Sequence, residues 1–270
     1  MKPSDLRHCR TLLFLPASNA RAIEKARTLE ADAIILDLED AVRPEDKAEA
    51  RATAIAATRE GFGDRVVALR INPAGTSHYG DDIVCVRKCR VDYVVLAKVE
   101  SARHVADAAW LTGRPVLAMI ETPRGVIDAA AIAPATRGLI AGTNDLCAEL
   151  GIAPGGGRIG LTYALQRILL AARAAGIAAF DGVYNGLTDD EGLAEECRHG
   201  RAFGFDGKTV IHPSQIETVN RIFGPSGEEI AEARRLIAEA NGGAERFEGR
   251  MIEAMHVAHA HNVLAKARQA

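Results

Sequence analysis

The segments PVLAMIET (residues 115–122) and RGLIAGTND (residues 137–145), from the middle of the chain, decide the fold. Each holds a short apolar run that is typical of a buried strand in a parallel sheet. Each also carries an acid where the run ends, Glu121 in the first segment and Asp145 in the second. Residues that favour the start of a helix stand beside both acids. The two segments therefore predict strand-then-helix units with acids at the carboxyl ends of the strands.

The rest of the chain repeats this alternation. Further strands are predicted at residues 11–17, 33–39, 65–72, 93–99, 178–184 and 206–211, which makes eight in all. Helical patterns lie at residues 20–30, 44–60, 79–89, 101–111, 124–132, 162–175, 189–203 and 213–223. Strands that alternate with helices pair in parallel through right-handed crossovers. Eight such units predict an α/β fold, the (β/α)8 TIM barrel, rather than a doubly wound sheet, because no glycine-rich dinucleotide fingerprint follows the first strand.

The chain changes character after residue 224. Residues 225–243 and 248–267 predict two additional C-terminal helices, which are more than barrel closure requires. We therefore expect a barrel catalytic domain over residues 1–224 and a helical extension over residues 225–270. The extension is expected to be a lid over the barrel mouth or an arm that contacts a neighbouring subunit. Within the barrel, the glycine-rich residues 152–158 predict a flexible loop between strands six and seven.

Composition limits the class of protein. The 270 residues are 48% hydrophobic and only 4% aromatic, which predicts one large domain with an aliphatic core. Its 33 basic and 36 acidic residues are interleaved, so no tract suggests a nucleic-acid partner. No apolar run is long enough for a membrane span, and the amino terminus lacks a signal-peptide core. The five cysteines follow no disulfide spacing. We therefore expect a cytoplasmic protein that binds neither nucleic acid nor a membrane.

Polar and charged residues gather at the predicted carboxyl ends of the strands, where barrel active sites lie. Any one of them could be a solvated loop charge or a helix cap, but the whole set predicts an active site. They are Asp37, Glu39, Asp40, Arg70, Asn72, Lys98, Glu121, Thr122, Thr143, Asn144, Asp145, Asp181, Asn185, Lys208 and His212.

The two acids of the opening segments suggest a metal. Carboxylates that face one crevice are costly to bury without a cation, and oxygen ligands favour a hard ion such as Mg²⁺. Only His212 stands at an equivalent position with a ligand suited to zinc. Glu121 and Asp145 are therefore the predicted Mg²⁺ ligands, although Asp145 could instead cap the following turn.

Arg70 is the natural partner for a carboxylate of the substrate. It leaves a buried strand, and its guanidinium can bind a carboxylate through two hydrogen bonds. An internal ion pair with Glu39 or Asp40 is the alternative, and both can hold at once. Lys98 is expected to give electrostatic support to the acids.

The chain resembles a known family over nearly its whole length. The matching segments, in order, are LLFLPASNARAIEKA, ADAIILDLEDAVRPEDKAEAR, LRINP, AMIETPRGV, AGTNDLCAELG, FDGVYNGLTDDEGL, FDGKTVIHPSQI and GRMIEA. They are similar to the HpcH/HpaI aldolase/citrate lyase family, in its citrate lyase beta subunit-like branch, which includes citramalyl-CoA and malyl-CoA lyases. The resemblance implies a TIM barrel, a homotrimer or dimer of trimers, and Mg²⁺. It also implies a CoA thioester and a 2-keto acid as substrates.

The resemblance also assigns roles to residues of this chain. Glu121 and Asp145 match the metal ligands, and Arg70 matches the arginine that binds the substrate carboxylate. The remaining matches are Lys25 at the CoA phosphates, Phe14 in the pocket, and Glu39 and Asp40 as acids near the metal and Arg70. Asn72, two residues after Arg70, is added to the predicted substrate-binding set.

Two positions depart from the family pattern. Asn19 stands where some relatives carry an arginine, with Arg21 two residues later, so contacts to CoA phosphates are expected to differ. In the C-terminal motif Met251-Ile252-Glu253, a glutamate replaces the family's aspartate, which acts as acid or base in a neighbouring subunit's site. Glu253 keeps the carboxyl group on a longer arm.

The expected activity is Mg²⁺-dependent cleavage or formation of a β-hydroxyacyl-CoA such as citramalyl-, malyl- or citryl-CoA. The products of cleavage are acetyl-CoA and a 2-keto acid. A malyl-CoA thioesterase-like hydrolase is the first alternative, and an aldolase on a free 2-keto acid is another. The chain could also be the beta subunit of a multi-subunit citrate lyase that uses an acyl-carrier-protein thioester.

Overall fold

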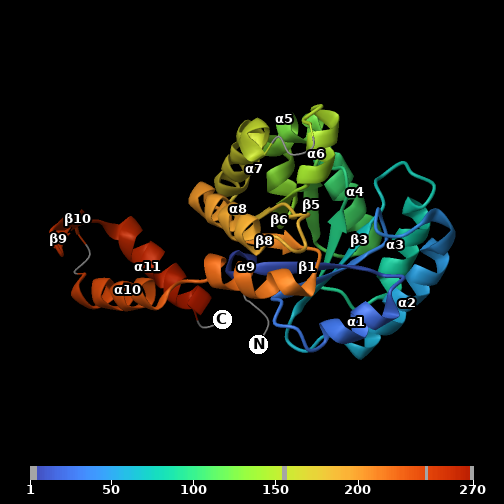
Figure 1. The fold of residues 1–270 in the computed structure, drawn as a ribbon. Coiled ribbons are helices and arrows are strands. Elements are labelled where there is room, and N and C mark those ends of the chain that lie inside the picture. The colour runs from blue at the N-terminus through green and yellow to red at the C-terminus, as the bar shows by residue number, and fades with distance from the viewer. Residues whose placement is uncertain (1–4, 154–156, 241–242, 268–270) are drawn as a thin grey trace.

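A computed structural model describes residues 5–153, 157–240 and 243–267 and confirms the predicted barrel. Eight parallel strands pair in chain order and close into a barrel (Figure 1). The circle closes because β8 pairs with β1. The strands are β1 (Thr11–Pro16), β2 (Ala33–Asp37), β3 (Val66–Ile71), β4 (Tyr93–Leu96), β5 (Val116–Ile120), β6 (Gly138–Ala141), β7 (Ala178–Asp181) and β8 (Gly207–Val210).

Helices cover the outside of the barrel at the predicted places. They are α1 (Ala20–Ala26), α2 (Lys47–Glu60), α3 (Tyr79–Lys88), α4 (Ala102–Thr112), α5 (Pro123–Ile132), α7 (Thr162–Ala174), α8 (Asp190–Phe203) and α9 (Ile216–Phe223). One short helix, α6 (Thr143–Glu149), follows β6 directly. The residues beside Asp145 indicated a helix start at this place, but its range was not among the predicted helices. Of the predicted glycine-rich loop, residues 154–156 lie outside the described ranges. No helix within those ranges has both the length and the hydropathy needed to cross a lipid bilayer.

The core has two layers, because side chains alternate along each strand. In β1, Leu12 and Phe14 face the barrel interior, whereas Leu13 and Leu15 pack outward among the residues that join the sheet to the helices. Both layers are mainly aliphatic, as the composition predicts. Dense packing of this kind holds the strand ends rigidly and so fixes the side chains that follow them.

Strand register determines which polar residues meet at the mouth of the barrel. Asp37 is the register partner of Arg70 between β2 and β3. Between β5 and β6, Ile120 is the partner of Ala141. Glu121 therefore emerges beside Gly142, and Arg70 emerges beside Asp37.

The C-terminal extension differs from the prediction in one respect. We predicted a helix over residues 248–267, but a hairpin of β9 (Glu245–Phe247) and β10 (Arg250–Ile252) comes first. The reason is a tight turn at Glu248 and Gly249, whose φ angles of 43° and 85° are incompatible with a helix. The second helix, α11 (Ala254–Ala267), starts only after this hairpin and packs on α10 (Gly227–Glu239).

The extension lies at the amino-terminal end of its own barrel. Lys266 on α11 donates a hydrogen bond of 2.5 Å to the backbone carbonyl of Asp206, which immediately precedes β8. The hairpin and most of α10 and α11 project away from the barrel (Figure 1). This segment therefore does not cover the mouth of its own barrel, and its contact with a neighbouring subunit stays a prediction.

A buried ion cluster ties the outer helices to the barrel. Asp181, at the end of β7, accepts two hydrogen bonds from Arg158, of 3.0 and 2.8 Å, and one of 3.1 Å from Lys208. Lys208 also pairs with Glu196 on α8 at 2.6 Å. Burial alone would raise the pKa of Asp181, but Lys208 and Arg158 outweigh it and lower that pKa. The sequence placed Asp181 and Lys208 among possible site residues, whereas the structure buries both in this cluster.

Neutralising Asp181 should destabilise the fold. The substitution Asp181→Asn leaves the buried Lys208 and Arg158 with Glu196 as their one remaining acid, and breaking such a cluster costs about 3–5 kcal/mol. Urea unfolding followed by circular dichroism measures this loss. Glu191→Gln, which breaks an exposed ion pair with Arg198, is the matched control and should change stability little. Equal stability of the two variants would refute the assigned role of the cluster.

Candidate active site

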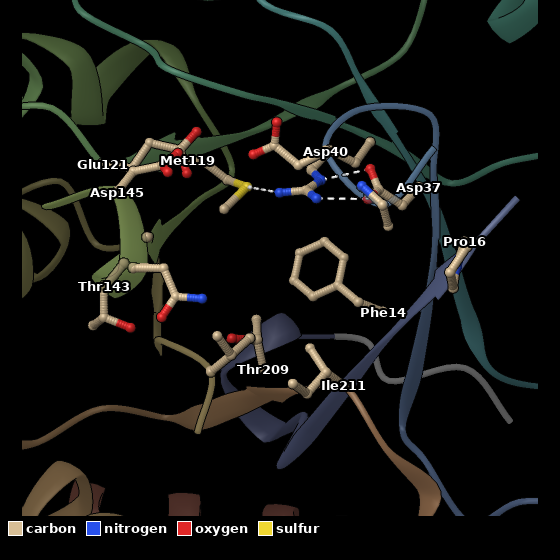
Figure 2. Close-up of a pocket in the computed structure, with 16 residues that line it drawn as sticks. Phe14, Pro16, Asp37, Asp40, Met119, Glu121, Thr143, Asp145, Thr209 and Ile211 are labelled. Carbon is tan, nitrogen blue, oxygen red and sulfur yellow. Dashed lines mark hydrogen bonds and ion pairs between the residues drawn. The ribbon is translucent and has the colours of Figure 1, made fainter. Parts of the chain in front are cut away.

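A cavity of about 250 Å³ opens at the carboxyl ends of the strands. Eight residues predicted for the site line it: Phe14, Asp37, Asp40, Arg70, Glu121, Thr143, Asn144 and Asp145. Figure 2 shows the acids Glu121 and Asp145 on one wall, with the Phe14 ring across the cavity. Arg70 lines the same cavity, and its guanidinium lies over the Phe14 ring. The structure therefore brings these predicted residues together at one end of the barrel.

Glu121 is almost fully buried, with 2% of its surface exposed. Its Oε1 accepts a hydrogen bond of 2.7 Å from the backbone N–H of Lys98. Burial, together with the negative charge of Glu39, raises the pKa of Glu121 to about 8. This carboxylate is therefore costly to ionise unless a cation joins it.

Gly142 makes room for this carboxylate. A Cβ atom at Gly142 would lie 2.3 Å from Glu121 Cβ and 2.4 Å from Glu121 Oε2, which are impossible separations. Glycine is thus required here by close approach, because the register of β5 and β6 sets the two residues side by side.

Asp145 lies in the first turn of α6 and faces the same cavity. The residue that caps this helix is Gly142, so the alternative in which Asp145 is the cap is wrong. The ammonium of Lys98 lies 3.4 Å from Asp145 Oδ2, 3.3 Å from Glu39 Oε1 and 3.9 Å from Asp40 Oδ2. Lys98 therefore links both predicted metal ligands, one through its backbone and one through its side chain.

The donor set at this wall suits a hard cation. In the described part of the chain, no group of three or more His, Cys, Asp or Glu side chains is arranged to hold a metal ion. Two carboxylates are what Mg²⁺ commonly takes from a protein, with water or substrate oxygens as its other ligands. Burial and the neighbouring acids raise the pKa of Glu121, so a positive charge at this place would favour its ionised form.

Arg70 is held from several sides. Its Nε and Nη2 donate hydrogen bonds of 2.6 Å to the two oxygens of Asp37, and Nη1 lies 3.1 Å from Glu39 Oε2. The guanidinium also stacks 4.8 Å from the centre of the Phe14 ring. The predicted internal ion pair is therefore present with Glu39, whereas Asp40 pairs with Lys98. Asp37 was not predicted as the main partner, although its register with Arg70 explains the contact.

Three of the residues predicted to bind substrate or to act in catalysis do not line this cavity. Asn72 is buried, and its Nδ2 donates to the carbonyl of Leu38 and to Asp82 Oδ2. Lys25 is exposed on α1, and Glu253 is exposed between β10 and α11. Their roles in substrate binding and catalysis stay predictions.

Comparison with known proteins gives the family. The profile of the HpcH/HpaI aldolase/citrate lyase family matches residues 10–213. The chain belongs to this family. A second profile, for C–C bond lyases of the TIM-barrel fold, matches residues 160–269.

The relatives carry several names. A (3S)-malyl-CoA thioesterase of Cereibacter sphaeroides is 43% identical over 96% of this chain and 94% of its own length. A citrate lyase subunit beta-like protein of Mycobacterium tuberculosis is 39% identical over 96% and 95%. Among solved structures, the protein CitE from M. tuberculosis, in complex with magnesium, acetoacetate and coenzyme A, superposes with a TM-score of 0.83. That chain is 37% identical, and the match covers 97% of this chain and 100% of that one.

The burial of Glu121 predicts an unusual dependence of stability on pH. Burial on folding raises the pKa of this carboxyl from its ordinary value of 4.5 to about 8. An acid whose pKa is raised by folding lowers stability as the pH rises from the unfolded to the folded value. With EDTA present, the free energy of unfolding should therefore fall over that interval, and Glu121→Gln should reduce the fall. Urea unfolding at several pH values measures the free energy of unfolding of the wild type and of Glu121→Gln. The same dependence of this free energy on pH in both proteins would contradict the prediction.

Proposed function

We propose that this protein is a Mg²⁺-dependent carbon–carbon lyase. Its substrate is a β-hydroxyacyl-CoA such as citramalyl-, malyl- or citryl-CoA, and its products are acetyl-CoA and a 2-keto acid. The observation that carries the proposal is the buried Glu121 carboxylate beside Asp145, with Arg70 across the same cavity. Solved relatives support it, because they hold magnesium with acetoacetate and coenzyme A, or magnesium with oxaloacetate.

Glu121 and Asp145 would hold the ion, since they supply the carboxylate oxygens that Mg²⁺ prefers. When bound, Mg²⁺ stabilises negative charge on substrate oxygens as a Lewis acid. Gly142 and the backbone N–H of Lys98 keep Glu121 in place.

Arg70 would bind the carboxylate of the keto-acid portion. Asp37 engages its Nε and Nη2, and Nη1 lies 3.1 Å from Glu39 Oε2, so a substrate carboxylate would share Nη1 with Glu39 or displace it. Phe14 and Asp37 restrict the guanidinium of Arg70 to one orientation. A substrate carboxylate bound to this fixed guanidinium is itself oriented, which removes much of the entropic cost of the reaction.

The reaction also requires proton transfer. In cleavage, the bond breaks between the hydroxyl-bearing carbon and the carbon next to the thioester. The hydroxyl group loses its proton and becomes the carbonyl of the keto acid. The bonding electrons form the enolate of acetyl-CoA, whose carbon then takes up a proton. Glu253 of a neighbouring subunit is our candidate for giving that proton, because in this chain the extension projects away from the barrel.

A direct assay tests the activity. Purified protein with Mg²⁺ should convert citramalyl- or malyl-CoA to acetyl-CoA and pyruvate or glyoxylate, and EDTA should abolish the reaction. Glu121→Gln and Asp145→Asn should each lower kcat/KM by about 10²-fold or more, because an interaction with developing charge is lost. Mg²⁺ should raise the Tm of the wild-type protein but of neither variant. A Glu121→Gln enzyme as active as the wild type would refute the metal assignment.

A mixing experiment tests the role of Glu253. Glu253→Ala and Glu121→Gln proteins should each be inactive, but co-refolded mixtures should regain activity. If the site takes its barrel from one subunit and Glu253 from the next, statistical mixing in a ring makes about one site in four complete. Activity that stays at the level of the separate variants would show that Glu253 does not act across subunits.

A thioesterase is the second candidate, favoured by the 43% identical relative named (3S)-malyl-CoA thioesterase. In that case water attacks the thioester carbonyl, and the bond to sulfur breaks. The same assay separates the two activities. A thioesterase releases free CoA thiol and malate without glyoxylate, whereas a lyase releases acetyl-CoA and glyoxylate without free thiol.

A further inference from the structure

Lys98 has a backbone conformation that its residue type rarely adopts. Its φ angle is 50°, in the left-handed region, and Glu248 in the hairpin turn is the one other non-glycine residue with positive φ in the described part of the chain. Glycine or asparagine would take this conformation at lower cost. A strained residue at a functional site points to a use for its side chain.

The conformation allows Lys98 to make contacts in two directions. Its backbone N–H donates a hydrogen bond of 2.7 Å to Glu121 Oε1, while its side chain reaches the neighbouring acids. There the ammonium lies 3.3 Å from Glu39 and 3.4 Å from Asp145. The lysine side chain is about one-third exposed, so the ammonium is able to move.

The charges at this end of the barrel are out of balance. Among the described residues, two cations, Arg70 and Lys98, pair with the acids at this end of the barrel. The five acids that gather here are Asp37, Glu39, Asp40, Glu121 and Asp145. Arg70 is engaged with Asp37 and Glu39. Among the described residues, Lys98 is therefore the cation that pairs with Asp145 and Asp40.

We propose that Lys98 is the resident counter-ion of the acidic wall and sets how tightly the site holds Mg²⁺. In the metal-free protein the ammonium neutralises Asp145 and Glu39. A divalent ion that binds Asp145 meets this positive charge at short range, so its affinity is lower than the carboxylates alone would give. The inference rests on the proposed Mg²⁺ site and adds a residue that tunes it.

The test uses Lys98→Met, which removes the charge but keeps the backbone N–H that holds Glu121. Isothermal titration calorimetry with Mg²⁺ should give a Kd at least about tenfold lower than for the wild type, equivalent to about 1.4 kcal/mol. The metal-free Tm of Lys98→Met should fall, and Mg²⁺ should raise it by more than it raises that of the wild type. Lys98→Arg keeps the charge and should bind Mg²⁺ like the wild type.

Two further variants secure the interpretation. Lys98→Gly relieves the left-handed backbone, so it should fold even if the methionine variant does not, and it should also bind Mg²⁺ more tightly. Lys88→Met removes an equal charge from an exposed position on α3 and should change nothing. Unchanged or weaker Mg²⁺ binding in Lys98→Gly or Lys98→Met would overturn the inference. If the wild type does not bind Mg²⁺, or Glu121→Gln binds it equally well, the proposed metal site itself fails.

Discussion

The carboxylate of Glu121 is buried at the end of β5. The arrangement of the charged residues around it depends on this burial. Ionising an acid in such a place is unfavourable without a positive charge nearby. The negative charges of Glu39 and Asp145 increase the cost of ionising Glu121 further. A folded chain that keeps so many acids together needs a further cation, and the open side of Glu121 and Asp145 faces a cavity from which one can come.

The register of the barrel strands brings these charged residues together. Parallel strands end level with one another, so residues that are distant in sequence meet at one rim. The pairing of β2 with β3 places Asp37 against Arg70, and the pairing of β5 with β6 places Gly142 against Glu121. Arg70 is thereby fixed before any substrate arrives, and Glu121 has space that a larger neighbour would fill. The rigid layers of the core give these contacts their precision.

Much of this could be predicted from the sequence, because hydrophobic periodicity is local. Apolar runs such as residues 116–120 and the helical patterns between them gave the barrel and its strand ends, and hence Glu121, Asp145 and Arg70. Contacts that depend on three-dimensional register were harder. The Asp37–Arg70 pair requires knowing that β2 and β3 are aligned at those residues. The double contact of Lys98 depends on one left-handed φ angle, which its residue type does not indicate.

The C-terminal extension also contains structure that local sequence patterns did not indicate. Its helical pattern hid the hairpin, because the turn at Glu248-Gly249 has only one glycine to mark it. The residues beside Asp145 indicated a helix start, but the range of α6 was not predicted, because this helix has no side-chain cap and spans only Thr143–Glu149. Both errors concern segments next to proposed catalytic residues, Glu253 and Asp145. Local rules are weakest where function, rather than packing, selects the residues.

The central claim is that Glu121 and Asp145 together hold a divalent cation. A crystal structure of the protein soaked with Mn²⁺ and recorded at a wavelength where manganese scatters anomalously tests it most directly. If the two residues hold the ion, the map will show one anomalous peak within bonding distance of both carboxylates, with water or a 2-keto acid completing the coordination. A map with no peak between these two residues, or with the metal bound elsewhere, would contradict it.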